Sequence, residues 1–330
     1  MEKFLLLFTV IFLFFIGAVF FSLLLSLARR ISVLLLEDEA EDEARYEALE
    51  DEALQDGEKA LAGELSAEEK KKRWARYGLK ELLGKDYVCD SCGQVLKVYE
   101  LIPVFGFLFA QGRCRYCGAR IRPSELLSEF LGGTLLVLVF FRFGRSGMLA
   151  QPFALSTVLD ISAAMTLRKM LALLLLFLVM GLLFLISMID LETMIIPNGL
   201  SLAMFVMGIL GVFLFPDVPW HEHLIGMMVV SLPMLLITLL IPGAFGGGDV
   251  KLMAGAGLLL GWKLTLLAAF LGIIGGGIFG TILLVTKKAG RKAHFAFGPF
   301  LCIGIVAAVL GGYSILSGYL SLTGGNYGNF

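Results

Sequence analysis

The chain has 330 residues, of which 58% are hydrophobic and 17% charged, and its mean hydropathy is +0.86. A water-soluble globular domain cannot cover so much apolar surface, so the composition excludes that class and predicts an all-α polytopic membrane protein. The net charge is only −1, with acidic and basic residues in separate blocks, and nucleic acid is therefore excluded as a partner.

The first candidate span is an uncharged run from Phe4 to Ala28. Its 25 residues exceed the apolar core of a secretory signal, and no small-residue cleavage site precedes Arg29 and Arg30. We expect residues 1–28 to form a retained transmembrane helix.

A polar region of about ninety residues follows, and it is the one part expected to form an extramembrane domain. Twelve acidic residues fall between Glu37 and Glu58, and a basic run, KKKRWAR, begins at Lys70. We expect residues 29–78 to be a charged cytoplasmic insertion. Two interpretations stay open: a solvated charged spacer, and an amphipathic helix favoured by the content of Ala, Glu, Leu and Lys.

Four of the five cysteines form two CxxC pairs in residues 79–124: Cys89, Cys92, Cys114 and Cys117. Pairs at this spacing, each followed directly by glycine, are typical of a structural zinc knuckle. Disulfides or free buried thiols are the alternative, which a cytoplasmic location disfavours. The fifth cysteine, Cys302, lies inside the last span and is expected to serve packing.

The remaining chain contains four further clear spans and three weaker ones. The clear spans are Leu171–Ile189, Leu224–Phe245, Leu264–Thr286 and Phe295–Leu322, and the weaker ones are Glu125–Phe141, Gly199–Phe215 and Val250–Trp262. Together they predict about eight transmembrane helices, with residues 125–330 as the main membrane domain.

Orientation follows from the basic loop Lys287–His294, which the positive-inside rule places in the cytoplasm. With eight spans, the polar region and the loops at Asp190 and Asp249 fall on the same side. Arg142, Arg145, Arg168 and Lys169 would then flank the opposite side. A re-entrant or interfacial segment around 150–165 would account for them.

Asp190 and Asp249 each stand at the boundary of an apolar run, the second directly after three glycines. Carboxylates at such positions are costly, and two that approach each other can share a proton, activate water and polarise a peptide carbonyl. Each also has a simpler interpretation. Asp190 could mark the interfacial end of a helix, and Asp249 could be the N-cap of the next helix.

The sequences SMIDLETMIIPN and GGGDVKLMAGAGLLLGW resemble the two signatures of the type IV prepilin peptidase family. FGPFL at 297–301 also matches the family pattern. The resemblance implies that Asp190 and Asp249 are the catalytic pair of an aspartic endopeptidase. Glu192 stands where many members carry a second acidic residue. It would either tune the pKa of Asp190 or be exposed in a loop. Lys251 would either stabilise the charge of Asp249 or extend toward lipid headgroups.

The cysteine region, with a Glu (Glu129) opening the next span, resembles the cytoplasmic domain of the same family. In members with a full domain, this region is implicated in methylating the new N-terminus from S-adenosylmethionine. The present sequence departs from the pattern in two ways. Its first span lacks the usual Asn, and the acidic insertion precedes the cysteines. S-adenosylmethionine is therefore a weaker expectation than zinc.

The resemblance implies an enzyme of the bacterial cytoplasmic membrane, with its active site facing the cytoplasm. It would cleave a short basic leader after a Gly from prepilin or pseudopilin precursors. Three alternatives stay open: a presenilin-like protease cutting within a membrane helix, a transporter or channel whose boundary carboxylates bind an ion, and a non-catalytic scaffold for secretion machinery.

Overall fold

The computed structural model describes residues 2–56, 89, 91–94, 97, 104–143, 167–215, 218–241, 244–286 and 295–322. Three features used above lie outside them: the basic run at 70–76, the segment around 150–165 and the loop 287–294 that sets the expected orientation.

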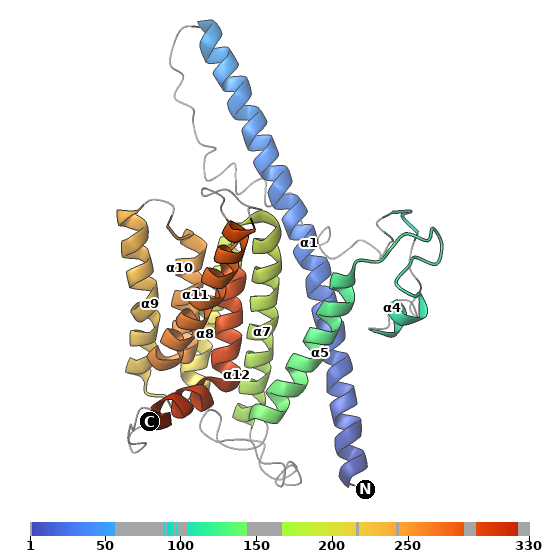
Figure 1. Cartoon of the computed structure of the whole chain (residues 1–330), viewed down its shortest axis with the longest axis vertical. Helices are drawn as coiled ribbons and strands as arrows, with labels where there is room; N and C mark the ends of the chain where they lie inside the picture. The colour runs from blue at the N-terminus through green and yellow to red at the C-terminus, as the bar shows by residue number, and fades with distance from the viewer. Residues whose placement is uncertain are drawn as a thin grey trace.

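Every regular element in the described part of the chain is a helix, apart from one isolated bridge between Arg113 and Arg120. The all-α prediction is confirmed. In chain order the helices are α1 (Glu2–Asp56), α4 (Phe105–Phe109), α5 (Pro123–Phe143), α7 (Leu167–Thr193), α8 (Asn198–Leu214), α9 (Trp220–Leu240), α10 (Gly247–Leu260), α11 (Trp262–Val285) and α12 (Gly298–Leu322) (Figure 1).

Six of these helices contain a segment long and apolar enough to cross a membrane. The segments are Leu6–Leu36, Pro123–Arg142, Met170–Thr193, Trp220–Leu240, Trp262–Val285 and Gly298–Tyr319. The two remaining expected spans are helical but short, since α8 has 17 residues and α10 has 14. A perpendicular span needs about 20 residues, so these two fall below the usual length.

Helix α1 does not end where its apolar run ends at Ala28. The helix has 55 residues in all and ends at Asp56, and in Figure 1 it extends beyond the helical bundle. No Gly or Pro interrupts the sequence between Gly17 and Gly57, and Ala, Glu, Leu and Arg all favour helix. Residues 29–56 of the insertion are therefore helical, and residues 57–78 lie outside the described part of the chain.

Helix α7 is the centre of the bundle: 67% of its apolar window is buried, against 39% or less in the other five spans. Helix α10 is held between α8 and α9 by contacts at small residues. A Cβ on Gly208 of α8 would lie 2.5 Å from the carbonyl oxygen of Gly255, and Gly257 meets Gly226 of α9 in the same way. Such close approach needs glycine on both helices, and it fixes α10 between α8 and α9.

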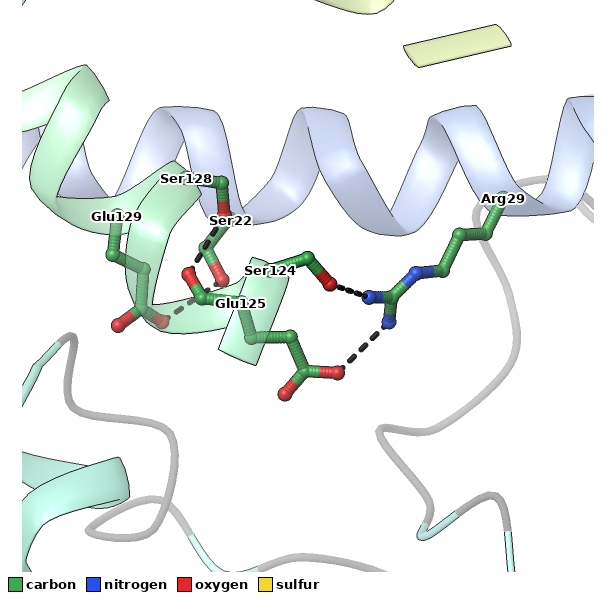
Figure 2. Close-up of polar contacts among 6 residues, drawn as sticks. All are labelled: Ser22, Arg29, Ser124, Glu125, Ser128 and Glu129. Carbon is green, nitrogen blue, oxygen red and sulfur yellow. Dashed lines mark hydrogen bonds and ion pairs between the residues drawn. The ribbon is translucent and has the colours of Figure 1, made fainter. Parts of the chain in front are cut away.

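Helices α1 and α5 form a second closely packed pair. A Cβ on Gly132 would lie 2.6 Å from the carbonyl oxygen of Gly17, so the two backbones cross in contact. Toward the start of α5, Arg29 of α1 binds Glu125 at 2.8 Å and the hydroxyl of Ser124 at 3.0 Å (Figure 2). The start of α5 is thereby aligned with the end of the uncharged run of α1.

Candidate active site

Asp190 lies one turn before the end of α7. Its side chain is 4% exposed, and Oδ2 accepts a hydrogen bond of 3.0 Å from the backbone N–H of Gly298, the first residue of α12. The first N–H groups of a helix have no partner within it and favour a negative charge. A Cβ on Gly298 would lie 2.7 Å from the same oxygen. The carboxylate is therefore buried and oriented by α12, unlike a solvated residue at a helix end.

Asp249 lies in the first turn of α10, whose N-cap is Gly246. The N-cap glycine has no side chain to form a capping bond, and its backbone lies beside Oδ2 of Asp249: a Cβ on Gly246 would lie 3.2 Å from that oxygen. The side chain is 8% exposed, and Oδ1 has no hydrogen-bond partner within the described residues. A buried oxygen left in this state is costly unless something else binds there. This oxygen is free to accept a water molecule or a substrate group.

The structure brings the two aspartates together, although they are 59 residues apart in sequence. They lie close enough for the charge of Asp190 to act on Asp249. Ile196 contacts the backbone beside both: a Cβ on Gly248 would lie 2.7 Å from Cβ of Ile196, and one on Gly298 would lie 3.3 Å from its Cδ1. Ile196 thus packs both against the turn that carries Asp249 and against the start of α12 that binds Asp190.

The starts of α8 and α10 are also tied directly. Nζ of Lys251 donates a hydrogen bond of 2.6 Å to Oδ1 of Asn198. The end of α7 and the starts of α8, α10 and α12 therefore meet around the acid pair, at the upper end of the bundle in Figure 1. Lys251 is bound to Asn198, which the sequence did not predict.

Other residues singled out in the sequence take clear positions. Glu192 is exposed at the end of α7, in agreement with a solvated residue. Cys302 is 3% exposed in the hydrophobic core, one turn after Gly298, as expected for packing. Gly298 itself was missed as a site residue. The available signal was FGPF, because a proline near a helix start marks the free N–H groups that attract a carboxylate.

The four cysteines of the two CxxC pairs converge, as the spacing predicted. Their sulfur atoms all lie within 4.8 Å of one another, and the sulfurs of Cys89 and Cys117 are 3.8 Å apart. A tetrahedral zinc ion with Zn–S bonds of about 2.3 Å has sulfur–sulfur edges of about 3.8 Å. Gly93 and Gly118 have φ of 68° and 73°, a conformation that suits glycine in the tight turns after each pair. The donor set fits zinc.

The pKa values of the cysteine thiols also favour binding of a cation between them. The backbone N–H groups of Cys117 and Tyr116 lower the pKa of Cys114 to about 7. At Cys117 the N–H of Ala119 acts in the same direction, but partial desolvation and the other three thiols outweigh it and raise the pKa to about 12. One thiolate thus opposes the next, and a divalent cation among them relieves that repulsion.

Glu129 joins three segments of the N-terminal half. Its Oε1 accepts a hydrogen bond of 3.2 Å from Ser22 of α1, and its Oε2 accepts one of 2.6 Å from the backbone N–H of Val104 (Figure 2 shows the bond to Ser22). Val104 has φ of 64°, which is rare for a β-branched residue and persists where surrounding contacts fix it. The carboxylate thereby fixes the start of α4 against α1 and α5.

Comparisons with known proteins cover the regions that contain both sites. Residues 176–281, which include both aspartates, match the model of the type IV leader peptidase family. Residues 15–143, which include the four cysteines, match the model of the bacterial peptidase A24 N-terminal domain. No solved structure matches the chain at a significant level.

Curated relatives carry the name prepilin leader peptidase/N-methyltransferase. One from Aeromonas salmonicida is 31% identical over 238 residues, covering 71% of this chain and 74% of the relative. One from Bacillus subtilis is 27% identical over 234 residues, covering 71% and 85%. One from Legionella pneumophila is 27% identical over 237 residues, covering 70% and 74%. With its helical fold and both motif regions matched, the chain belongs to the type IV leader peptidase family.

Proposed function

We propose that this protein is an aspartic endopeptidase of the bacterial cytoplasmic membrane that removes the leader from type IV prepilins or pseudopilins, with Asp190 and Asp249 as its catalytic pair. The observation that carries the proposal is the meeting of two buried carboxylates at one end of a membrane bundle. Neither forms an ion pair among the described residues, and Oδ1 of Asp249 has no hydrogen-bond partner among them.

The chemistry follows from one proton shared between the two acids. The ionised carboxylate accepts a proton from a water molecule, whose oxygen attacks the carbonyl carbon of the scissile peptide. The protonated carboxyl donates its proton to the carbonyl oxygen. The tetrahedral intermediate then collapses, the C–N bond breaks, and the leaving nitrogen takes up a proton. The N–H of Gly298 holds Asp190 in one orientation through these steps.

A cytoplasmic location of the site is supported by the loop Lys287–His294. This segment directly precedes α12 in the chain, and the start of α12 is where Gly298 meets Asp190. Four basic residues in a short loop favour the cytoplasmic side. A prepilin whose hydrophobic helix stays in the bilayer would present its basic leader there.

The test is co-expression of the protein with a prepilin, scored by gel mobility and by the N-terminal mass of the product. Asp190→Asn and Asp249→Asn are each expected to slow leader removal by on the order of a hundred- to ten-thousandfold while membrane levels stay at wild type. Glu192→Gln, an exposed acid two residues from Asp190, is the matched control and should cleave normally. Normal cleavage by both Asp variants would contradict the proposal and favour a scaffold.

We also propose methylation of the new N-terminus, supported by the N-terminal domain match and the names of the relatives. S-adenosylmethionine would supply the electrophilic methyl group. The four cysteines would hold a structural zinc ion with no open position for substrate. In the same co-expression, the processed product should carry the added mass of one methyl group. An unmethylated product with normal cleavage would refute this second activity alone.

A further inference from the structure

Helix α4 presents an aromatic surface that nothing in the described residues covers. Phe105, Leu108 and Phe109 are 42%, 55% and 79% exposed. They lie in the polar region that the sequence predicts to be outside the membrane. Figure 1 places α4 beside the part of α1 that α5 crosses, far from the end of α1 at Asp56.

The depth of α4 follows from its contacts with α1. The ring of Phe105 stacks on Phe15 with centroids 5.9 Å apart. Phe15 lies near the middle of the uncharged run Phe4–Ala28 and precedes Arg29 by 14 positions. At 1.5 Å per residue this is about 21 Å along the helix, while the hydrocarbon core is about 30 Å thick. Phe105 therefore reaches well into the hydrocarbon.

The contacts of α5 also place α4 below the membrane boundary but at a smaller depth, since Phe130 lies only five residues, about 7.5 Å along the helix, past Glu125. Glu125 at its start binds Arg29, and one turn further on Glu129 binds the N–H of Val104, immediately before α4. The next residue, Phe130, packs edge to face on Phe14 with centroids 5.9 Å apart. Phe130 and Phe105 thus contact neighbouring residues of α1, and α4 lies level with a transmembrane part of α5.

A segment at this depth must satisfy its backbone internally, because lipid offers no hydrogen bonds. The described backbone around α4 does so at several N–H groups. Five backbone N–H groups donate to backbone carbonyls within the segment: Leu108 to Val104, Ala110 to Gly106, Gln111 to Leu108, Gly112 to Phe107 and Arg113 to Ala110. The N–H of Val104 donates to the carboxylate of Glu129. Left-handed conformations at Gln111 and Gly112, with φ of 50° and 67°, turn the chain back toward the cysteines.

We propose that α4 is a re-entrant helix whose exposed aromatic face is covered by lipid acyl chains. The occupant follows from continuity, since this face adjoins apolar residues of two membrane helices: Phe12 and Ile16 of α1 and Leu127 and Phe130 of α5 are 41–67% exposed. Insertion holds the cysteine knuckle against the membrane surface, because Cys114 follows α4 by only five residues. The inference does not depend on the peptidase assignment.

The experiment places a photoreactive benzoylphenylalanine at one position at a time in the full chain, in native membranes. After illumination, intact mass identifies what has been captured. Three aromatic positions are matched: Phe109 on α4, Phe130 on α5 at 57% exposure as the lipid-facing control, and Tyr116 in the knuckle at 44% exposure as the aqueous control. We expect phospholipid adducts at 109 and 130 in comparable yield, and little at 116.

Three results would overturn the proposal. The first is the absence of a lipid adduct at 109 when 130 gives one. The second is capture of a protein at 109 in place of lipid, either a second copy or a co-expressed prepilin, which would make α4 a docking surface for a helix. The third is an equal lipid yield at 116, which would show that α4 is no deeper than the knuckle.

Discussion

At the start of α12, a missing Cβ makes room for a carboxylate. The N–H of Gly298 donates to Oδ2 of Asp190, and any side chain at this position would begin 2.7 Å from the oxygen that it binds. The same residue therefore supplies a donor and the space for its acceptor. Asp249 has no such partner for Oδ1 among the described residues, so the two acids have different environments.

We predict that Gly298→Ala lowers kcat for leader removal by on the order of tenfold to a hundredfold, with a smaller change in KM. The added methyl group must displace the Asp190 carboxylate by part of an ångström, and misplacement on this scale costs rate more than binding. Gly318→Ala, in the same helix and with no atom near its Cβ, is the control and should be silent. A kcat of Gly298→Ala equal to wild type would refute the positioning role.

At the scale of helices, glycines decide how near the elements approach. The Gly17–Gly132 crossing of α1 and α5 brings Ser22 within reach of Glu129. It also brings Arg29 to Glu125 and Ser124. The partly exposed ion pair contributes only about 0.2–1 kcal/mol, so close packing is the main contribution at this crossing.

Gly132→Val is expected to destabilise the protein by roughly 1–3 kcal/mol, because its side chain would meet the backbone of α1 and no rotamer can avoid that contact. The midpoint of thermal aggregation of the detergent-solubilised protein should fall accordingly. Gly277→Val in α11 makes the same change in helix propensity but has open space around its Cβ. If both variants lowered the midpoint equally, the α1–α5 contact would not be the cause.

Across the whole molecule, the two sites lie in two separate helix groups. The cysteine knuckle and α4 are attached to α1 and α5, whereas the acid pair is formed by the ends of α7, α8, α10 and α12. The two family models also divide the chain between these groups. Disturbing one site should therefore leave the other intact.

Cys114→Ser is expected to release the metal and abolish N-methylation while leader removal continues near the wild-type rate. Purified wild-type protein should contain about one equivalent of zinc, and the variant much less. Cys302→Ala, which removes the buried thiol of α12, should retain the zinc and so control for thiol loss in general. Loss of cleavage in Cys114→Ser, with zinc-free protein still in the membrane, would show that the two sites are coupled.

The sequence by itself determined the membrane class, the eight helical segments, the cysteine cluster and the identity of both aspartates as site candidates. Each rests on local information: runs of apolar residues, CxxC spacing, and motifs that combine an acid with Gly or Pro. It also left the acidic insertion open between two forms, because charge blocks alone do not distinguish a solvated helix from a coil.

Only the tertiary structure decided that Gly298 orients Asp190, that Lys251 binds Asn198, and that Glu129 fixes Val104. These pairs are between 25 and 108 residues apart in the chain. It also decided that α4 lies beside the middle of the uncharged run of α1, although the sequence predicts its region to be outside the membrane. Hydropathy and motifs are properties of neighbouring residues, whereas these contacts depend on which helices cross and how closely their backbones approach.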